Sequence, residues 1–439
     1  MSNTNSPQEL LARIKELENE NKQLKSRKKF GLVWEDKPED VLFQCTENIP
    51  VLREVKNRKI VKDNSVQDNL LIEGDNYHAL SVLNYTHKNK IDLIFIDPPY
   101  NTGSNTWRYN NDYVDKEDTF RHSKWISFMH NRLSLAKNLL KEDGVLILTI
   151  DDYEIFSIGS LLDSIFGDDN RMNVVIVENN PRGRTSNAFF ATSHEYYLYY
   201  AKDSSKVELN NIPLTNEQEA VFKHEDDISK YRLLPLRKSG ADSRRPDRPK
   251  QFYPIYINEK TLEMTLEFKK GWFELLPIDS EGVERVWKLG KDSCKELIKN
   301  GDIIVKPSKD SFTLSQKDRL KEGRKPKTVW VNPKYDASAH GTIMIANILN
   351  KRDSFDYPKS LHAVIDSIYP VISKREKAVV LDFFAGSGTT GHAVLELNKQ
   401  DGGNRKFILC TNNENKICEE VTYERIKRVI KGYTNKKGE

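Results

Sequence analysis

The chain has 439 residues, of which 37% are hydrophobic and 31% are charged. This length allows one large domain, or two to three modest ones, with at least one hydrophobic core. The formal net charge is only +4, so the overall balance cannot identify a nucleic-acid partner and the positions of the charges must be considered.

The sequence contains no pattern typical of a membrane span, a signal peptide or a metal site. There is no apolar run of about 18 residues, and the polar N-terminus lacks the apolar stretch of a signal peptide. The four cysteines form no Cys-x-x-Cys pair and do not lie near a histidine at zinc-ligand spacing. We therefore expect a soluble cytoplasmic protein with reduced, mostly buried thiols, no metal site and no membrane contact.

The first thirty residues differ in pattern from the rest. Leu10, Ile14, Leu17, Asn21 and Leu24 follow a heptad repeat, with Glu and Lys at most other positions. This predicts an N-terminal helix over 1–30. It is either a short coiled coil that forms a homodimer or a single solvated helix, because so few heptads are marginal alone.

From Asn69 onward, apolar strands alternate with helices, which predicts a doubly wound, mostly parallel α/β sheet. The expected strands are Leu70–Glu73, Ile91–Ile96, Val145–Ile150, Val379–Phe383 and Lys406–Cys410, and the expected helices begin near Tyr77 and cover 124–140, 392–397 and 417–430.

The α/β alternation breaks down between residues 174 and 340. From Arg171 to His340 there are 31 Lys and Arg against 25 Asp and Glu, so the basic character is concentrated there. We expect an inserted domain at 174–340, which divides a catalytic domain into 31–173 and 341–433, followed by a tail at 434–439.

A glycine loop follows one of the buried strands. In Val380–Gly391, a strand leads into Gly386-Ser-Gly388 and then a helix, at the end of a strand where open α/β sheets bind ligands. The spacing of Gly386, Gly388 and Gly391 also fits the dinucleotide fingerprint. The loop could hold a dinucleotide, hold S-adenosylmethionine or be a tight structural turn.

A second loop carries Asp97-Pro98-Pro99-Tyr100 directly after the apolar run IDLIFI. The prolines remove two N–H donors, which leaves a loop of acceptors suited to an exocyclic amine. Tyr100 offers a flat face on which a base can stack. The alternative is an ordinary loop in which proline ends a strand, although this tetrad is rare by composition.

These two motifs resemble those of the amino-methyltransferases of DNA. Their order, with the tetrad first, then a long insert and then Asp382-x-Phe-x-Gly-x-Gly-Thr389, resembles the β-group of these enzymes. Further stretches resemble the modification subunits of type III restriction systems and their shorter relatives: Gly31–Asp36, Asp97–Gly103, His194–Tyr196, Phe355–Lys359 and Arg405–Leu409. The resemblance covers roughly residues 30–432.

The resemblance implies a Rossmann-like methyltransferase fold with an inserted α+β target-recognition domain, and S-adenosyl-L-methionine as cofactor. The residues that it implies for cofactor binding are Asp75, Asn76, Phe355, Pro358, Lys359, Asp382, Phe384, Gly386, Gly388 and Thr389. One position departs from the family pattern. The strand after the glycine helix lacks the acid expected for the ribose hydroxyls, and either Asn412 or Glu414 would replace it.

The implied reaction is methyl transfer to adenine N6 in duplex DNA, with the base flipped out of the helix. The catalytic residues are then Asp97, Pro98, Pro99 and Tyr100. Asp97 and the Pro98 carbonyl accept the amine hydrogens, and Tyr100 stacks on the base. Asp at position 97 resembles the adenine enzymes more than the N4-cytosine enzymes, which are the alternative. A dinucleotide-dependent oxidoreductase is a weaker alternative.

Two basic clusters of the insert are expected to contact DNA phosphates and bases. The first is Arg232, Arg237, Lys238, Arg244, Arg245, Arg248 and Lys250, and the second is Lys317, Arg319, Lys321, Arg324, Lys325 and Lys327. Either could instead be a solvated surface. Because no helicase P-loop or nuclease constellation is seen, we expect methylation without cleavage, and any restriction activity would belong to a separate subunit.

Overall fold

The computed structural model describes Lys15 and residues 37–60, 69–102, 104–109, 112–115, 118–183, 189–309 and 311–434. It divides the chain into a sheet unit, Met1–Asn210 with Pro326–Glu439, and an inserted unit, Asn211–Lys325. The predicted N-terminal helix lies outside the described residues, except for Lys15.

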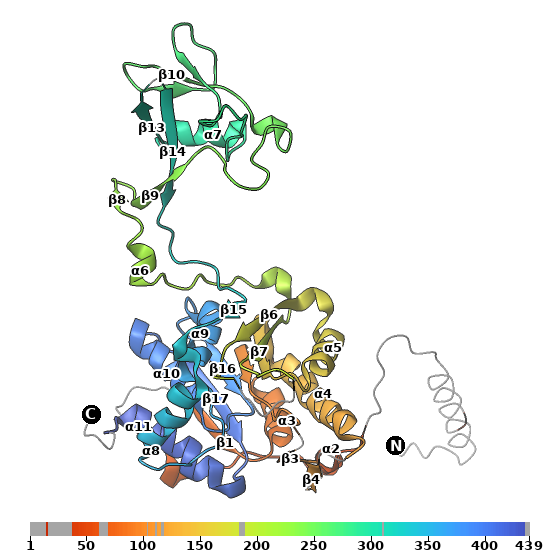
Figure 1. Ribbon diagram of the computed structural model, residues 1–439. Coiled ribbons are helices and arrows are strands. Elements are labelled where there is room, and N and C mark those ends of the chain that lie inside the picture. The colour runs from red at the N-terminus through yellow and green to blue at the C-terminus, as the bar shows by residue number, and fades with distance from the viewer. Residues whose placement is uncertain are drawn as a thin grey trace, which may run out of the picture. The chain divides into compact units, whose positions relative to one another are not determined.

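The sheet unit is built on eight strands in the order β1-β17-β16-β2-β5-β7-β6-β15 (Figure 1). Their bounds are β1 Leu70–Glu73, β2 Ile91–Ile96, β5 Leu140–Ile150, β6 Arg171–Val177, β7 Glu195–Ala201, β15 Val329–Trp330, β16 Val379–Asp382 and β17 Lys406–Thr411. Of these described strands, β7 pairs antiparallel with β5 and β6, and the other pairs are parallel.

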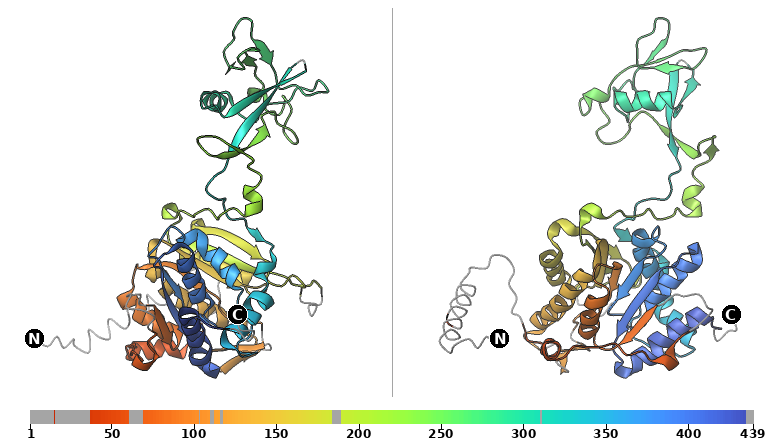
Figure 2. Two further views of the ribbon diagram at one scale, coloured as in Figure 1. Left: turned by 90° about the vertical axis from the view of Figure 1, so that its left-hand side faces the viewer. Right: turned by 180° about the vertical axis from the view of Figure 1, so that it is seen from behind.

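Helices cover both faces of this sheet, as the views in Figures 1 and 2 show. Their bounds are α2 Asp40–Glu47, α3 Asn76–Thr86, α4 Arg121–Leu139, α5 Ile155–Phe166, α8 Ile343–Leu349, α9 Leu361–Ile372, α10 Thr389–Asp401 and α11 Glu424–Lys431. A two-stranded ribbon, β3 Ser104–Tyr109 with β4 Asp112–Asp115, follows the tetrad loop.

The two faces of β2 explain its continuous apolar sequence. Ile94 and Ile96 pack into a core that contains residues of α3, α4 and α5, whereas Leu93 and Phe95 pack into a second core with α9 and α10. Successive side chains of a strand point to opposite faces, so a strand covered on both sides must be apolar at every position. The expected doubly wound sheet follows from this pattern.

The helix after the glycine loop begins three residues earlier than the sequence predicts. It starts at Thr389 instead of His392, so Gly391 lies inside α10. A Cβ atom on Gly391 would lie 2.8 Å from Ile426 Cδ1 and 2.9 Å from Leu409 Cδ1. The third glycine therefore permits close packing of the helix against its neighbours, and only the first two shape the loop.

The inserted unit has its own hydrophobic core, which includes Leu236, Tyr253, Trp287 and Cys294. It contains a four-stranded sheet, β13-β14-β9-β8, and a three-stranded sheet, β11-β10-β12. The bounds are α6 Asn216–Glu219, β8 His224–Glu225, β9 Lys230–Pro235, β10 Ile255–Ile257, β11 Met264–Thr265, β12 Phe273–Leu275, α7 Lys291–Lys299, β13 Ile303–Ser308 and β14 Ser311–Arg319.

This unit is shorter than the domain of 174–340 expected from the sequence. The flanking segments 174–210 and 326–340 belong to the sheet unit, because β6, β7 and β15 pair into the main sheet. The antiparallel strand β7 interrupts the β-α alternation, and for that reason the sequence pattern places the boundary too early.

Candidate active site

The carboxyl ends of neighbouring strands bring the predicted motifs to one edge of the sheet. Asp75 follows β1, the glycine loop follows β16 and Asp97 follows β2, and β16 pairs in parallel with β2. Glu195 reaches the same edge from the other direction, because β7 is antiparallel and Glu195 is its first residue. The tetrad and the glycine loop therefore share an edge, as the sequence interpretation requires.

Asp97 is anchored through one carboxylate oxygen. Its Oδ1 accepts a hydrogen bond from Thr149 Oγ1 at 2.6 Å and pairs with Lys359 Nζ at 3.0 Å. Within the described chain no donor bonds to Oδ2, and the side chain is 28% exposed. One oxygen is thus fixed by the protein while the other can accept an N–H from a ligand.

The rest of the tetrad is held by its neighbours. Trp125 Nε1 donates to the Pro99 carbonyl at 2.7 Å, whereas no described residue donates to the Pro98 carbonyl. The Tyr100 hydroxyl donates to Glu195 Oε2 at 3.0 Å and lies 3.3 Å from Thr149 Oγ1. Free acceptors therefore remain at Asp97 Oδ2 and Pro98.

Burial raises the pKa of the Tyr100 hydroxyl well above its ordinary value, and the carboxylates of Asp97 and Glu195 raise it further. The hydroxyl stays protonated and can keep donating to Glu195. This bond fixes the tilt of the ring, on which a base can stack.

Glu195 and Lys359 form a buried ion pair beside the tetrad. Lys359 Nζ lies 2.7 Å from Glu195 Oε2, and the two side chains are 10% and 3% exposed. Lys359 also contacts the Tyr100 hydroxyl. Burial acts to lower the pKa of Lys359, but the Asp97 and Glu195 carboxylates outweigh it and raise that pKa, so the ammonium is charged.

Sequence reasoning assigned no role to Glu195, although the His194–Tyr196 stretch carried part of the resemblance. The available signal was an acid that opens an otherwise apolar strand, EYYLYYA. Lys359 was expected with the cofactor motif, and the structure places its ammonium against the tetrad. A role of Lys359 toward the cofactor stays a prediction.

The glycine loop bends through two left-handed residues. Gly386 has φ +47° and Gly388, which precedes α10, has φ +78°. The Phe355 ring lies against Gly386, so that a Cβ there would be 3.0 Å from Phe355 Cζ. Thr422 Oγ1 donates to the Gly386 carbonyl at 2.5 Å. Both glycines adopt the left-handed backbone that the turn requires, and the Phe355 ring packs against it. A role of Phe355 toward the cofactor stays a prediction.

Buried polar side chains support this loop from below. Asp382 accepts from the Phe384 amide at 2.9 Å and from Thr390 Oγ1 at 2.5 Å. Burial raises the pKa of Asp382 to about 7, although its hydrogen bond with Thr390 acts in the opposite direction. The buried Arg425, which sequence reasoning missed, donates to Thr389 Oγ1 at 2.9 Å. Thr389 and Asp382 thus hold the loop in place.

The acidic turn after β1 is pinned to the glycine loop. Asp75 caps α3 by accepting from the Tyr77 amide at 2.7 Å, and Asn76 Nδ2 donates to the Phe383 carbonyl at 3.1 Å. Arg132, buried in α4, donates to Asn76 Oδ1 at 2.5 Å and pairs with Glu39 at 2.7 Å. Arg132 and Glu39 are further supporting residues that the motifs did not indicate.

The order of the strands fits S-adenosyl-L-methionine. Along β1-β17-β16-β2 the edge carries the Asp75 turn, then Asn412, then the Gly386 loop and then Asp97. A cofactor bound with its adenine at the Asp75 turn and its methionine part at the glycine loop would have its methyl-bearing sulfur on the side of the tetrad. Asn412 is exposed and Glu414 partly buried, so both predicted ribose partners border this edge.

The basic residues of the inserted unit fall into two groups. Lys317 and Arg319 of β14 pair with Asp226 at 2.8 and 2.7 Å, and Arg319 also pairs with Asp302 at 2.6 Å. These cations are held within the unit and stabilise it.

The loop from Arg237 to Lys250 differs from β14. Arg245 pairs with Glu284 at 3.0 Å and Arg248 lies 3.9 Å from Asp242. Four cations have no carboxylate partner in the described structure: Arg237, Lys238, Arg244 and Lys250. Of the second predicted group, Lys325 and Lys327 are exposed and Arg324 is partly buried.

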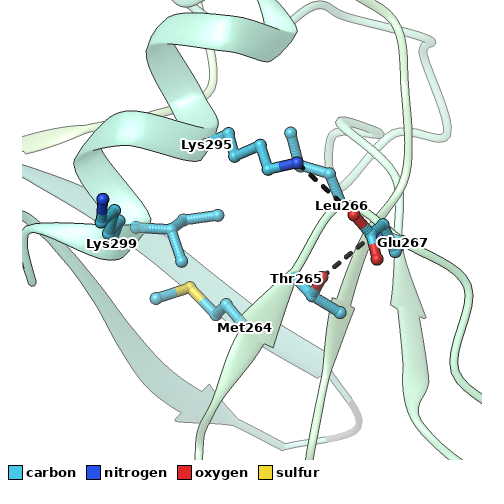
Figure 3. Close-up of a pocket in the computed structure, with 7 residues that line it drawn as sticks. Met264, Thr265, Leu266, Glu267, Lys295 and Lys299 are labelled. Atoms are coloured by element: carbon cyan, nitrogen blue, oxygen red, sulfur yellow. Dashed lines mark hydrogen bonds and ion pairs between the residues drawn. The ribbon is translucent and has the colours of Figure 1, made fainter.

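A small hollow in the inserted unit lies between β11 and α7 (Figure 3). Met264, Leu266 and Ile298 line it with apolar atoms, and Lys295 at its rim pairs with Glu267 at 3.4 Å. It contains none of the predicted catalytic or DNA-binding residues. In the described part of the chain, no helix is long and apolar enough to cross a membrane, and no cluster of three or more metal-ligating side chains occurs.

Comparisons with known proteins agree with this geometry. A profile of the DNA methylase family matches residues 91–423. The chain is 36% identical over 359 residues to the type II methyltransferase M.KpnI of Klebsiella pneumoniae. This match covers 80% of this chain and 82% of that protein. It is 31% identical over 453 residues to the Mod subunit of the type III restriction-modification enzyme EcoPI of Escherichia phage P1, covering 93% and 69%.

Among solved structures, the cytosine-N4-specific PvuII DNA methyltransferase matches with 9% identity, covers 84% of this chain and 94% of its own, and has a TM-score of 0.43. The sequence matches confirm the expected methyltransferase resemblance and fold class, with S-adenosyl-L-methionine as methyl donor and DNA as substrate. With its matched region spanning both the tetrad and the glycine loop, the chain belongs to the DNA methylase family.

Proposed function

We propose that the protein methylates the N6 amine of adenine at specific sites in duplex DNA. The observation that carries this proposal is the Asp97 carboxylate, held through Oδ1 and open at Oδ2. An exocyclic amine has two N–H groups, and Asp97 Oδ2 and the Pro98 carbonyl are two adjacent free acceptors. Asp at position 97, together with the resemblance to adenine enzymes, favours adenine over cytosine.

The acceptors prepare the amine for reaction. The lone pair of the N6 amine is delocalised into the ring, and hydrogen bonds to Asp97 and Pro98 favour a tetrahedral nitrogen with a localised lone pair. S-adenosyl-L-methionine, when bound along the β1–β16 edge, supplies an electrophilic methyl group on a positively charged sulfur. The negative charge of Asp97 offsets the positive charge that develops on nitrogen, and fixed positioning supplies much of the rate.

Tyr100 and Trp125 determine where the base sits. Trp125 fixes the Pro99 carbonyl, and Glu195 fixes the Tyr100 hydroxyl. A base flipped out of the duplex stacks on the Tyr100 ring, and stacking compensates for part of the energy lost on unpairing. The catalytic assignment of Asp97, Pro98, Pro99 and Tyr100 rests on this arrangement.

Recognition of DNA belongs in this proposal to the inserted unit, with Arg237, Lys238, Arg244, Arg245, Arg248, Arg324 and Lys325, and to the adjoining Lys327. Cations that lack a carboxylate partner can neutralise phosphates, and Arg can bind guanine with two hydrogen bonds. A separate restriction subunit is a proposed partner, because one of the relatives is a Mod subunit of a type III restriction-modification enzyme. The homodimer and the cytoplasmic location remain predictions.

The test is a methylation assay with duplex DNA in which no adenine or cytosine is methylated. The protein is incubated with duplex DNA and S-adenosyl-L-methionine labelled in the methyl group, and the bases are released and separated. We expect label in N6-methyladenine, at sites that single-molecule sequencing maps to one recurring sequence. Asp97→Ala should lose the signal and keep the melting temperature.

Two results would contradict the proposal. Label in N4-methylcytosine would leave the family intact and establish the cytosine alternative. A preference for RNA of the same sequence over duplex DNA would reject DNA as the substrate.

A further inference from the structure

In the mechanism above Glu195 only fixes the Tyr100 hydroxyl, although it is one of the most buried charged groups at the site. Its side chain is 3% exposed and pairs with Lys359 Nζ at 2.7 Å. Lys359 in turn pairs with Asp97 Oδ1 at 3.0 Å. Three ionisable groups therefore lie in a row, Asp97–Lys359–Glu195. They come from the loop after β2, the segment before α9 and the first residue of β7.

We propose that Glu195 and Lys359 are positioning residues that set the charge of the site: Lys359 fixes Asp97, and Glu195 cancels the charge of Lys359. This inference rests on the proposed function. With all three groups ionised, the row has a net charge of minus one, and that charge is available at the open oxygen of Asp97.

The need for Glu195 follows from the arithmetic of charge. A lysine alone beside Asp97 would make a neutral pair, so the positive charge that develops on the amine would meet little net negative potential. Buried charges interact strongly because they are poorly screened. The second carboxylate restores the negative potential without occupying Asp97 Oδ2.

Methyl transfer also requires that a proton leave the amine. As the new N–C bond forms, the C–S bond breaks and the sulfur becomes neutral, while the nitrogen becomes positive. One N–H bond then breaks, and its proton forms an O–H bond with Asp97 Oδ2. The electron pair of that N–H bond stays on nitrogen, and Asp97 becomes neutral until it releases the proton to solvent.

Lysine is the residue that allows Asp97 to be ionised next to Glu195. Without a cation between them, the carboxylates of Asp97 and Glu195 would repel each other, and sharing one proton would relieve that repulsion. The other titratable groups that face the row are the hydroxyls of Tyr100 and Tyr197 and the carboxyl of Asp382. Tyr100 and Tyr197 donate hydrogen bonds to Glu195 and stay protonated, so neither replaces the charge of Lys359.

The experiment compares two single variants with their combination. Glu195→Gln leaves a neutral row and Lys359→Met leaves two facing carboxylates, so each should lower kcat on duplex DNA by about 100-fold. The double variant again has a net charge of minus one, and we expect kcat to recover by about tenfold over either single variant. Losses that add up in the double variant would overturn the proposal.

The pH dependence separates charge from packing. In Lys359→Met the acid limb of the kcat profile should move to higher pH by about one to two units, because Asp97 must first lose the shared proton. An unmoved limb would contradict our proposal. Lys141→Met is the matched control: Lys141 pairs at 2.7 Å with the buried Asp92 at the other end of β2, and its loss should not change the profile.

A stability measurement tests the same idea without activity. In Lys359→Met we expect repulsion between the two carboxylates to make the folded protein bind a proton more tightly than the unfolded chain does, so stability should be lost as the pH rises and this proton leaves. The melting temperature of the variant should therefore fall below that of the native protein at pH 8 and approach it near pH 5. A deficit that does not depend on pH would indicate packing alone. If the native protein fails to methylate DNA, the proposed function is rejected, but the melting temperatures still test whether Lys359 separates the charges of Asp97 and Glu195.

Discussion

In the sheet unit the ion pair of Lys359 and Glu195 beside the tetrad is buried, whereas the cations of the inserted unit proposed to meet DNA are largely exposed. Lys359 is 10% exposed between two carboxylates, but Arg244 and Lys250 are exposed with no carboxylate partner in the described structure. Buried charges hold one geometry for chemistry. Exposed cations act through salt-dependent attraction, which tolerates small errors in position.

The same contrast exists within the inserted unit. Arg319 is held by Asp226 and Asp302, and Arg237 is not held by any carboxylate of the described structure. Sequence composition counts both as basic residues, yet only the second kind has no carboxylate that competes with a phosphate, although the Arg237 guanidinium does donate to the Ile278 carbonyl. The number of arginines in a cluster is therefore a poor guide to its function, and the partner of each arginine is a better one.

The largest expected effect is at the catalytic carboxylate. Asp97→Asn keeps the shape of the side chain but removes its charge and places an N–H₂ group next to Lys359 or the incoming amine. We expect kcat to fall by about 1000-fold or more, with unchanged binding of S-adenosyl-L-methionine by calorimetry. Asp168→Asn, the same change at an exposed turn after α5, should keep full activity.

The second effect distinguishes crowding from backbone strain. Gly386→Ala places a Cβ 3.0 Å from the Phe355 ring at φ +47°, so it both crowds the glycine loop and strains its backbone. The left-handed strain costs about 1 kcal/mol of stability. We expect the crowding to displace the loop and to raise the KM for S-adenosyl-L-methionine by about tenfold. Gly240→Ala in the inserted unit has φ +83° and open space around its Cβ. Gly240→Ala should lower the melting temperature about as much as Gly386→Ala does, because both carry left-handed strain, and it should leave that KM unchanged.

The third effect tests the contrast between held and free cations. The triple variant Arg237→Ala, Arg244→Ala, Lys250→Ala removes three unpaired charges, and the slope of log K against log salt should become shallower by about two to three. DNA binding is measured by fluorescence anisotropy over a range of salt concentrations. An unchanged slope would mean that this loop does not meet phosphates.

Arg319→Ala is the matched control for the triple variant. It removes a charge that pairs with Asp226 and Asp302, so it should lower the melting temperature and change the salt slope little. If Arg319→Ala instead changes the slope as much as one of the free cations does, the distinction between held and free cations is wrong.

The sequence predicts the two motifs and their shared edge because each motif directly follows a buried strand. The strand pattern of Ile91–Ile96 and Val379–Phe383 is continuous and apolar, and parallel strands end at the same edge. These features are local, so one sequence suffices to find them. The fold class and the transfer of a methyl group to DNA follow from the same stretches.

The supporting residues could not be predicted in this way, because each acts through a contact distant in sequence. Glu195 meets Tyr100, 95 positions earlier, and Arg132 meets Glu39 over 93 positions. Glu195 comes to the site only because β7 runs against its neighbours, and nothing in EYYLYYA states the direction of a strand. The same antiparallel strand displaced the predicted start of the insert from 211 to 174.

The smallest expected effect concerns the buried acid beneath the glycine loop. Burial raises the pKa of Asp382 to about 7 in the folded protein, against about 3.9 in an unfolded chain. The folded state therefore binds this proton more tightly, and the stabilisation is complete below about pH 4 and lost as the pH rises through 7. Asp382→Asn has no such proton, so its stability should not change in this way. Between pH 5 and pH 8 the melting temperature of the variant, relative to that of the native protein, should therefore rise by about 2 to 4 °C.

Scanning calorimetry at several pH values checks this difference, with Asp168→Asn as the exposed control, whose curve should run parallel to the native one. Parallel curves for Asp382→Asn would mean that Asp382 is ionised throughout. Its hydrogen bonds from Phe384 and Thr390 would then outweigh its burial, and the glycine loop would be held by a charge. In that case the supports of both loops, the row beside Asp97 and the acid below Gly386, would depend on buried negative charge.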